Sequence, residues 1–222
     1  YIILSSLFID FYTLSPPLIA STFLLLAFRY LLKQMKQERI EYPGFMMGFF
    51  TGVAVLAYPS TFVFVGYFLL SMLLFTSFSL KKNLLYLWGV FFPLGVVAFY
   101  YIIVGAFWVY IKDILFYSFT QLNYWYLSPQ SLFVIILLPV LLLLLSVLKL
   151  SRATGYVNFQ INVRSVMLLF LIAGCVVFFI SPKKSAYHLT LLIVPLSYFI
   201  AEYFVNFRKN FFKNLTFYMF FF

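Results

Sequence analysis

Long apolar runs, separated by short clusters of lysine and arginine, follow one another along the whole sequence. Each run holds 15 to 22 residues, and a helix needs about 20 residues to cross a bilayer core of about 30 Å. The runs are continuous and do not alternate with polar residues, which predicts helices instead of the strands of a membrane barrel. The pattern predicts an all-α, polytopic transmembrane helix bundle with seven spans: Leu14–Leu32, Gly44–Tyr58, Ser60–Leu80, Leu84–Gly105, Ser131–Leu150, Ser165–Ser181 and His188–Asn206.

The first and last residues also lie in apolar stretches. Tyr1–Ile9 reads as the end of a further span, and Thr216–Phe222 reads as the start of another. We therefore expect residues 1–222 to form one transmembrane domain that is an internal piece of a longer chain, with partial spans at both ends.

The distribution of charge decides between two topologies. The stretch Gly44–Leu80 contains no charged residue, so it forms either one long kinked helix or a hairpin broken at Tyr58-Pro59-Ser60. The hairpin leaves twelve lysines and arginines on one side of the membrane and three on the other, whereas a single helix divides them seven to eight. Basic loops face the cytoplasm, so the uneven division favours the hairpin and places the twelve bases there.

This topology assigns each loop to one side of a bacterial inner membrane. The loops expected in the cytoplasm are Lys33–Pro43, Lys81–Asn83, Ser151–Arg164 and Phe207–Leu215. The extracytoplasmic segments are the turn at Asp10, the tip at Pro59, the segment Ala106–Gln130 and the loop Pro182–Tyr187. No cytoplasmic loop is long enough to fold as a domain, so we expect any chemistry on the extracytoplasmic side or within the bundle.

The composition supports a membrane protein and excludes other classes. Hydrophobic residues make up 65% and charged residues 9% of the chain, against about 25% charged residues in soluble domains. The net charge of +10 comes from bases scattered among loops, without the basic groove or arm of a nucleic-acid-binding protein. Cys175 is the only cysteine, so neither a disulfide framework nor a thiolate metal cluster is expected.

Three glycines, Gly44, Gly48 and Gly52, recur at every fourth position. This spacing places them on one face of a helix, where the backbone of a neighbouring helix can come close. We therefore expect helix packing at this stripe, with a substrate groove as the alternative.

The segment Ala106–Gln130 is too polar to span a membrane, yet it is rich in aromatic residues. Its polar residues recur at three- to four-residue spacing, which predicts an interfacial helix with one polar and one apolar face. The polar stripe, with Tyr187, either belongs to an aromatic belt or lines the mouth of a cavity for an amphiphilic substrate. The candidate residues in the stripe are Lys112, Asp113, Tyr117 and Gln121.

A basic pair, Lys183 and Lys184, lies on the side of the membrane that the other bases avoid. A lysine ammonium binds phosphate as a point charge, so the pair and the nearby His188 are candidates for a lipid-phosphate site. The alternative is a solvated loop. His188 has no neighbours in sequence that would complete a metal site, so no metal is assigned to it.

Glu202 is an ionisable residue inside a predicted span. Such a position is typical of functional groups. The alternative is that its side chain extends toward Arg208 or Lys209 at the cytoplasmic end of the span.

Two stretches resemble the glycosyltransferase-C superfamily. Gly44 through Ser60, followed by an apolar run and the pair Lys81-Lys82, resembles its glycine-rich helix, short turn, helix and basic loop. The segment from Phe179 to His188 is similar to the Ser-x-x-Lys-x-x-Tyr segment of the aminoarabinose and mannosyl transferase branch. The composition, rich in Phe, Tyr and Lys, also resembles that of uncharacterised polytopic membrane proteins of Bacteroidetes.

The resemblance implies a many-helix enzyme that moves a sugar from a polyprenyl-phosphate carrier to an acceptor at the extracytoplasmic face. Lys183 or Lys184 would contact the carrier phosphate. The catalytic acids, and any divalent metal, would lie in a loop N-terminal to Tyr1, so no catalytic residue is assigned in this sequence. Two other functions fit the pattern: a non-enzymatic subunit of a larger membrane complex, and a transporter or flippase. The expected partners are membrane lipid, polyprenyl phosphate included, or protein subunits.

Overall fold

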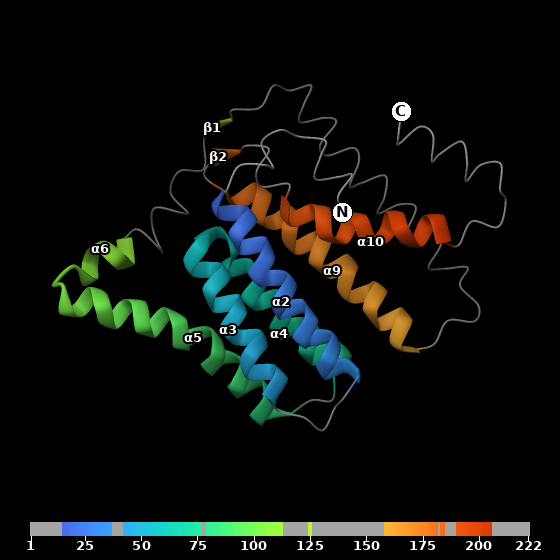
Figure 1. The fold of residues 1–222 in the computed structure, drawn as a ribbon, viewed down its shortest axis with the longest axis horizontal. Coiled ribbons are helices and arrows are strands. Elements are labelled where there is room, and N and C mark those ends of the chain that lie inside the picture. The colour runs from blue at the N-terminus through green and yellow to red at the C-terminus, as the bar shows by residue number, and fades with distance from the viewer. Residues whose placement is uncertain are drawn as a thin grey trace.

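The computed structural model describes residues 15–36, 42–76, 79–112, 124–125, 158–181, 183–184 and 190–205. These residues form helices and their connections, apart from two short strands that pair with each other (Figure 1). The elements in chain order are α2 (Pro16–Lys36), α3 (Tyr42–Ala57), the 3-10 helix η2 (Pro59–Phe62), α4 (Val63–Phe75), α5 (Leu80–Ile103), α6 (Phe107–Ile111), β1 (Tyr124–Trp125), α9 (Asn158–Ile180), β2 (Lys183–Lys184) and α10 (Thr190–Val205). The predicted helical architecture is confirmed at this level.

Three helices are long and apolar enough to cross a membrane, which supports the prediction of a membrane protein. They are Pro16–Lys36, Leu80–Ile103 and Phe159–Ile180. Three further apolar helices, Tyr42–Ala57, Pro59–Phe75 and Thr190–Phe199, are shorter. The predicted span Ser131–Leu150 lies outside the described residues. The structure therefore gives three candidate spans and does not confirm seven full ones.

Several helices continue through charged residues at which the sequence analysis ended the spans. α2 extends to Lys36, and α5 already begins at Leu80, so Lys81 and Lys82 lie in its first turn. α9 begins at Asn158, and Arg164 is therefore inside this helix and not in a loop. The predicted boundaries were wrong here because lysine and arginine are good helix formers whose long side chains can leave the apolar region while the backbone stays helical.

α3, η2 and α4 form a hairpin and not one long helix. Gly44 of α3 lies beside Lys82 of α5, and Gly52 lies beside Val90, so α3 and α5 run parallel. Since α4 connects them, it must run in the opposite direction. The helix breaks at Tyr58, which has an extended backbone and is followed by a proline that disfavours helix before it. The hairpin inferred from the charges is therefore present.

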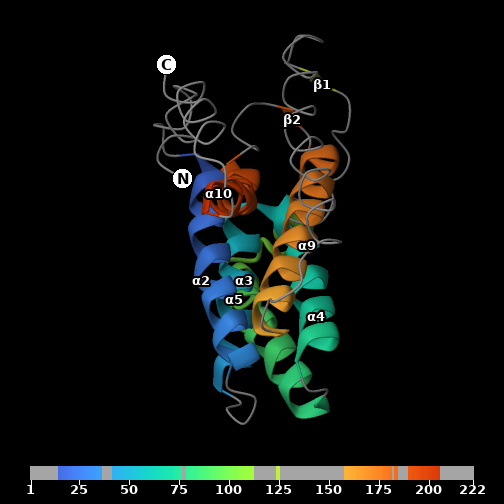
Figure 2. The same ribbon diagram turned by 90° about the vertical axis from the view of Figure 1, so that its right-hand side faces the viewer.

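Most of the helix ends lie at one of two ends of the bundle (Figures 1 and 2). One end holds the start of α2, the turn between α3 and η2, the end of α9 and both strands. The opposite end holds the end of α2 and the starts of α3, α5 and α9. This grouping is the one that the hairpin topology predicts; which end faces the cytoplasm stays a prediction.

Aromatic side chains fill the contact among α2, α4 and α9. The rings of Phe64 and Phe170 have centroids 4.8 Å apart, and Phe28 meets Phe170 edge-on at 6.0 Å. Tyr67 packs on Phe170 at 5.4 Å and donates its hydroxyl to the carbonyl of Val166 at 3.1 Å. Offset and edge-on ring pairs are the favourable arrangements, so this cluster holds α9 against the hairpin.

The last turns of α5 extend away from the other helices, and α6 folds back beside them (Figure 1). The turn lies at Gly105, whose φ of 74° is readily adopted only by glycine. Tyr110 of α6 stacks on Tyr101 at 5.1 Å and donates to the carbonyl of Leu94 at 3.1 Å. The predicted interfacial segment thus begins with a short helix that rests on α5.

Candidate functional site

The strand pair joins two segments that are far apart in the sequence. β1 and β2 pair in parallel, with Tyr124 opposite Lys183 and Trp125 opposite Lys184. β1 belongs to the predicted interfacial segment, and β2 is the basic pair of the predicted phosphate site. The backbone of these two elements therefore meets at one end of the bundle.

A hydrogen bond ties the α3–η2 turn to the end of α9, next to the strand pair. The hydroxyls of Tyr58 and Ser181 lie 2.6 Å apart, and Ser181 is two residues before Lys183. The Thr61 hydroxyl donates to the carbonyl of Tyr58 at 2.6 Å, which fixes the turn. Burial raises the pKa of Tyr58, and its bond to Ser181 opposes that shift. Tyr58 is thus a neutral hydroxyl that holds the chain just before β2.

The predicted site residues have different outcomes in the structure. Lys183 and Lys184 form β2. Lys112 is exposed and follows α6. The remaining predicted residues lie outside the described part of the chain: Asp113, Tyr117, Gln121, Tyr187 and His188. The structure therefore brings the basic pair to the interfacial segment at Tyr124 and Trp125.

The glycine stripe lies at the contact between α3 and α5. A methyl group on Gly48 would overlap the carbonyl of Tyr86, and one on Gly52 would lie 2.5 Å from the carbonyl of Val90. Gly89 of α5 faces the same contact, where a methyl group would overlap the carbonyl of Phe45. Sequence analysis missed Gly89 because a single glycine in a helix has no periodicity to reveal it.

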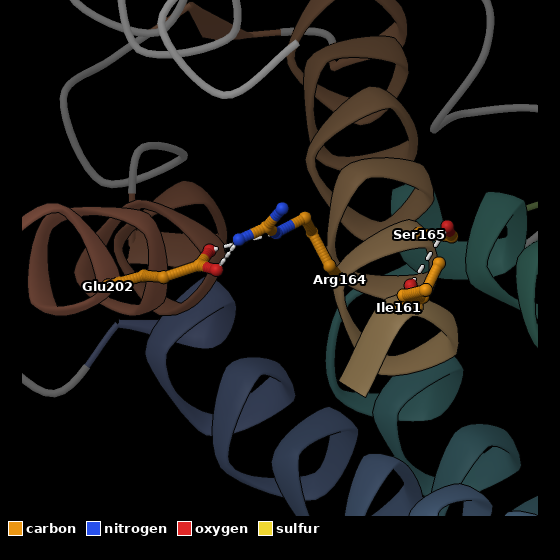
Figure 3. A network of polar contacts seen from close by, with 4 residues as sticks. All are labelled: Ile161, Arg164, Ser165 and Glu202. Carbon is orange, nitrogen blue, oxygen red and sulfur yellow. Dashed lines mark hydrogen bonds and ion pairs between the residues drawn. The ribbon is translucent and has the colours of Figure 1, made fainter. Parts of the chain in front are cut away.

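An ion pair connects α9 and α10 (Figure 3). Arg164 donates through Nε to Glu202 Oε2 at 3.1 Å, and its Nη2 contacts Glu202 Oε1. The side chains are 5% and 17% exposed, respectively. The two parallel contacts form the bidentate arrangement in which arginine binds carboxylate most strongly. Glu202 is the only carboxylate among the described residues, and it is held by an arginine from another helix.

Sequence analysis predicted a different surrounding for Glu202. It proposed Arg208 or Lys209, which lie outside the described residues, and it placed Arg164 in a loop. The two partners are 38 residues apart, so no short-range spacing connects them. The available signal was the presence of one basic residue near the start of one apolar helix and one acidic residue near the end of the next.

The described residues contain no group of three or more histidine, cysteine, aspartate or glutamate side chains that could hold a metal ion. No protein-family model matches the chain, and no curated protein or solved structure was found to be similar to it.

Proposed function

We propose that the protein binds a polyprenyl-phosphate-linked sugar at the end of the bundle that carries the strand pair, and transfers the sugar to an acceptor there. In this proposal the membrane is a bacterial inner membrane, and the strand-pair end is extracytoplasmic. The end of α2 and the starts of α5 and α9, at the opposite surface, are cytoplasmic, as the positive-inside rule favours.

The pairing of β1 with β2 carries this proposal. A phosphate-linked lipid needs cationic groups for its phosphate and an amphipathic surface for the sugar and the first isoprene units. Lysine supplies the charge, while tyrosine and tryptophan are the residues that favour the boundary between lipid and water. The backbone pairing brings Lys183 and Lys184 next to Tyr124 and Trp125, so both requirements are met by neighbouring positions.

The roles that follow are those of binding and orientation. The ammonium groups of Lys183 and Lys184 neutralise the carrier phosphate and stabilise the charge that develops on it when the sugar leaves. Tyr58 and Ser181 hold the chain next to β2. No residue of this sequence is assigned as the base that activates the acceptor.

The test is binding of a fluorescent polyprenyl phosphate to the full chain in lipid nanodiscs. The double variant Lys183→Gln/Lys184→Gln should lose at least tenfold in affinity, while Lys81→Gln/Lys82→Gln at the opposite end serves as the matched control and should bind normally. Equal affinity of both double variants would contradict the proposal. Transfer from a polyprenyl-phosphate sugar, followed by release of the unglycosylated carrier, then tests the reaction.

A second candidate, a non-enzymatic subunit of a membrane complex, is favoured by the surface of α5 and α6. Trp88 and Phe99 of α5 and Trp108 of α6 are 69%, 64% and 73% exposed, and the last turns of α5 extend away from the other helices (Figure 1). Membrane subunits associate through such helix surfaces when side chains interlock. Co-purification of one partner in stoichiometric amount, lost on Phe99→Ala/Trp108→Ala, together with absent lipid-phosphate binding, would favour this candidate.

A further inference from the structure

α9 and α10 meet closely at only one of their two ends. Near their connection, a methyl group on Gly174 of α9 would lie 2.6 Å from the side chain of Leu192 of α10. Away from the connection the helices diverge (Figure 1), and the long side chains of Arg164 and Glu202 extend toward each other between them (Figure 3). The two helices thus form a V with a tight contact near its apex and an ion pair across its open end.

The two contacts are in the same antiparallel register. Arg164 is ten residues before Gly174, and Glu202 is ten residues after Leu192. At 1.5 Å per residue the ion pair lies about 15 Å from the tight contact along either helix. In the other direction α9 continues for six residues beyond Gly174, to Ile180, and β2 begins three residues later.

This geometry makes α9 a lever. If α9 tilts about its contact with Leu192, a displacement at Arg164 produces a smaller displacement of opposite direction at Ile180, where the helix ends six residues beyond Gly174. The bond between Ser181 and Tyr58, 2.6 Å long, would not survive a displacement of several ångströms.

The ion pair is suited to fixing the opening of the V. Both side chains are largely buried, and a lone charge in an apolar helix is strongly disfavoured, so the pair resists separation. The planar guanidinium also fixes the direction of approach through its two contacts. A pair of apolar side chains that only met at their ends would set neither distance nor direction.

We propose that Arg164 and Glu202 are positioning residues: their ion pair sets the opening of the α9–α10 V and thereby holds Lys183 and Lys184 where β2 pairs with β1. The part of this inference that concerns ligand binding rests on the proposed function. The part that concerns the helices does not depend on it.

The first experiment measures the opening itself in the full chain. Spin labels at Gln160→Cys and Ala201→Cys, both exposed positions near the open end, are introduced after Cys175→Ala, and their distance is measured by pulsed electron resonance in nanodiscs. Glu202→Ala and Arg164→Ala should each broaden the distance distribution and shift its mean by several ångströms. The exchanged pair Arg164→Glu/Glu202→Arg should restore a narrow distribution. Unchanged distances in both alanine variants would overturn the proposal.

The second experiment connects the opening to the lysines. Fluorescent polyprenyl phosphate should bind Glu202→Ala at least tenfold more weakly than the unaltered protein, and the exchanged pair should bind within threefold of it. Gly48→Ala, which loosens a different helix contact, is the control for general destabilisation and should leave affinity and label distance unchanged. If the unaltered protein binds no lipid phosphate, the proposed function fails while the distances still decide the role of the pair. If it binds, and Glu202→Ala binds equally well, the positioning role is contradicted.

Discussion

The contacts α3–α5 and α9–α10 hold apolar helices together in opposite ways. Between α3 and α5, Gly48, Gly52 and Gly89 allow the backbones to approach until a single methyl group would overlap the opposing carbonyl. Between α9 and α10, close approach occurs at Gly174, and two long charged side chains connect the helices where they diverge. In lipid, helices gain little by hiding apolar surface from one another, so close packing and polar contacts are the available sources of stability.

The difference has a consequence for how each contact responds to change. The α3–α5 contact depends on glycines that have no side chain, and a larger residue at these positions would not fit. The α9–α10 contact depends on Arg164 and Glu202. Removing one of them lowers the free energy of unfolding strongly, whereas replacing both by apolar residues changes it little. The following predictions test this contrast.

The largest effect is expected from added volume at Gly48. Gly48→Leu should lower the free energy of unfolding by about 3 kcal/mol, because the side chain would overlap the backbone of Tyr86 and force α3 from α5. Reversible unfolding in bicelles, followed by circular dichroism, measures it. Gly66→Ala in α4 is the matched control: nothing lies within 4 Å of a methyl group there, and alanine favours helix by up to about 1 kcal/mol. A loss at Gly66 equal to that at Gly48 would contradict the close-contact explanation.

A smaller loss is expected when one partner of the ion pair is removed. Glu202→Ala should cost about 2 kcal/mol, because it leaves the Arg164 guanidinium, 5% exposed, without its carboxylate, and a buried donor that loses its partner costs about 1–3 kcal/mol. The apolar double variant Arg164→Met/Glu202→Leu should recover most of this stability in the same unfolding assay. Its label distance should nevertheless stay broad, since apolar side chains restore burial without fixing the opening. If the double variant lost as much stability as the two single substitutions added together, the prediction that the charged pair can be replaced as a unit would be contradicted.

A contact could be predicted from the sequence where its pattern lies within one helix, and not where it depends on two helices. The stripe of Gly44, Gly48 and Gly52 is periodic within one helix, and the hairpin at Pro59 was readable because the bases on both sides of it would otherwise divide evenly. The pairing of Arg164 with Glu202 has no local signal, since it depends on the register of two helices. Hydropathy also placed the start of this span at Ser165, one residue after Arg164, which the structure buries.

The candidate site was predictable only in part for a similar reason. Lys183 and Lys184 were identified because they depart from the charge pattern of the whole chain. The position of Tyr124 and Trp125 beside these lysines was not predicted, because a parallel pair of two-residue strands reflects where two connections meet in space. Neither strand has a period of its own from which the pairing could be read.

An intermediate effect is expected for a hydroxyl on the α5 side of the comparison. Tyr86 is fully buried and donates to the carbonyl of Val65 at 3.0 Å, which links α5 to α4. Tyr86→Phe should cost about 1 kcal/mol, the usual net value of such a bond. Tyr100→Phe on the same helix, where the ring is 62% exposed, should change stability by less than about 0.5 kcal/mol. Equal losses would mean that the bond from Tyr86 to Val65 contributes no more than an exposed hydroxyl does, which would contradict this role for Tyr86.

The smallest effect concerns the hydrogen bond that joins the two regions, between Tyr58 after α3 and Ser181 after α9. Tyr58→Phe should cost about 0.5 kcal/mol near neutral pH, since the partner Ser181 keeps a hydroxyl that can bond elsewhere. The difference should depend on pH in a defined direction. Burial raises the pKa of Tyr58 in the folded protein, so folding favours the protonated phenol. That contribution is complete below the ordinary tyrosine pKa of about 10 and is lost as the pH rises through the raised value.

Unfolding of the unaltered protein and of Tyr58→Phe, compared from about pH 8 to about pH 11, measures this dependence. The unaltered protein should lose stability faster above about pH 10, because the Tyr58 phenol ionises more easily in the unfolded state than in the folded protein. The other tyrosines are present in both proteins, so their contributions cancel in the comparison. Label distance across the open end of α9 and α10 should stay unchanged in Tyr58→Phe, since the ion pair is intact. A widened distance would instead show that the α3–η2 turn, and not Arg164 with Glu202, determines how far the two helices open.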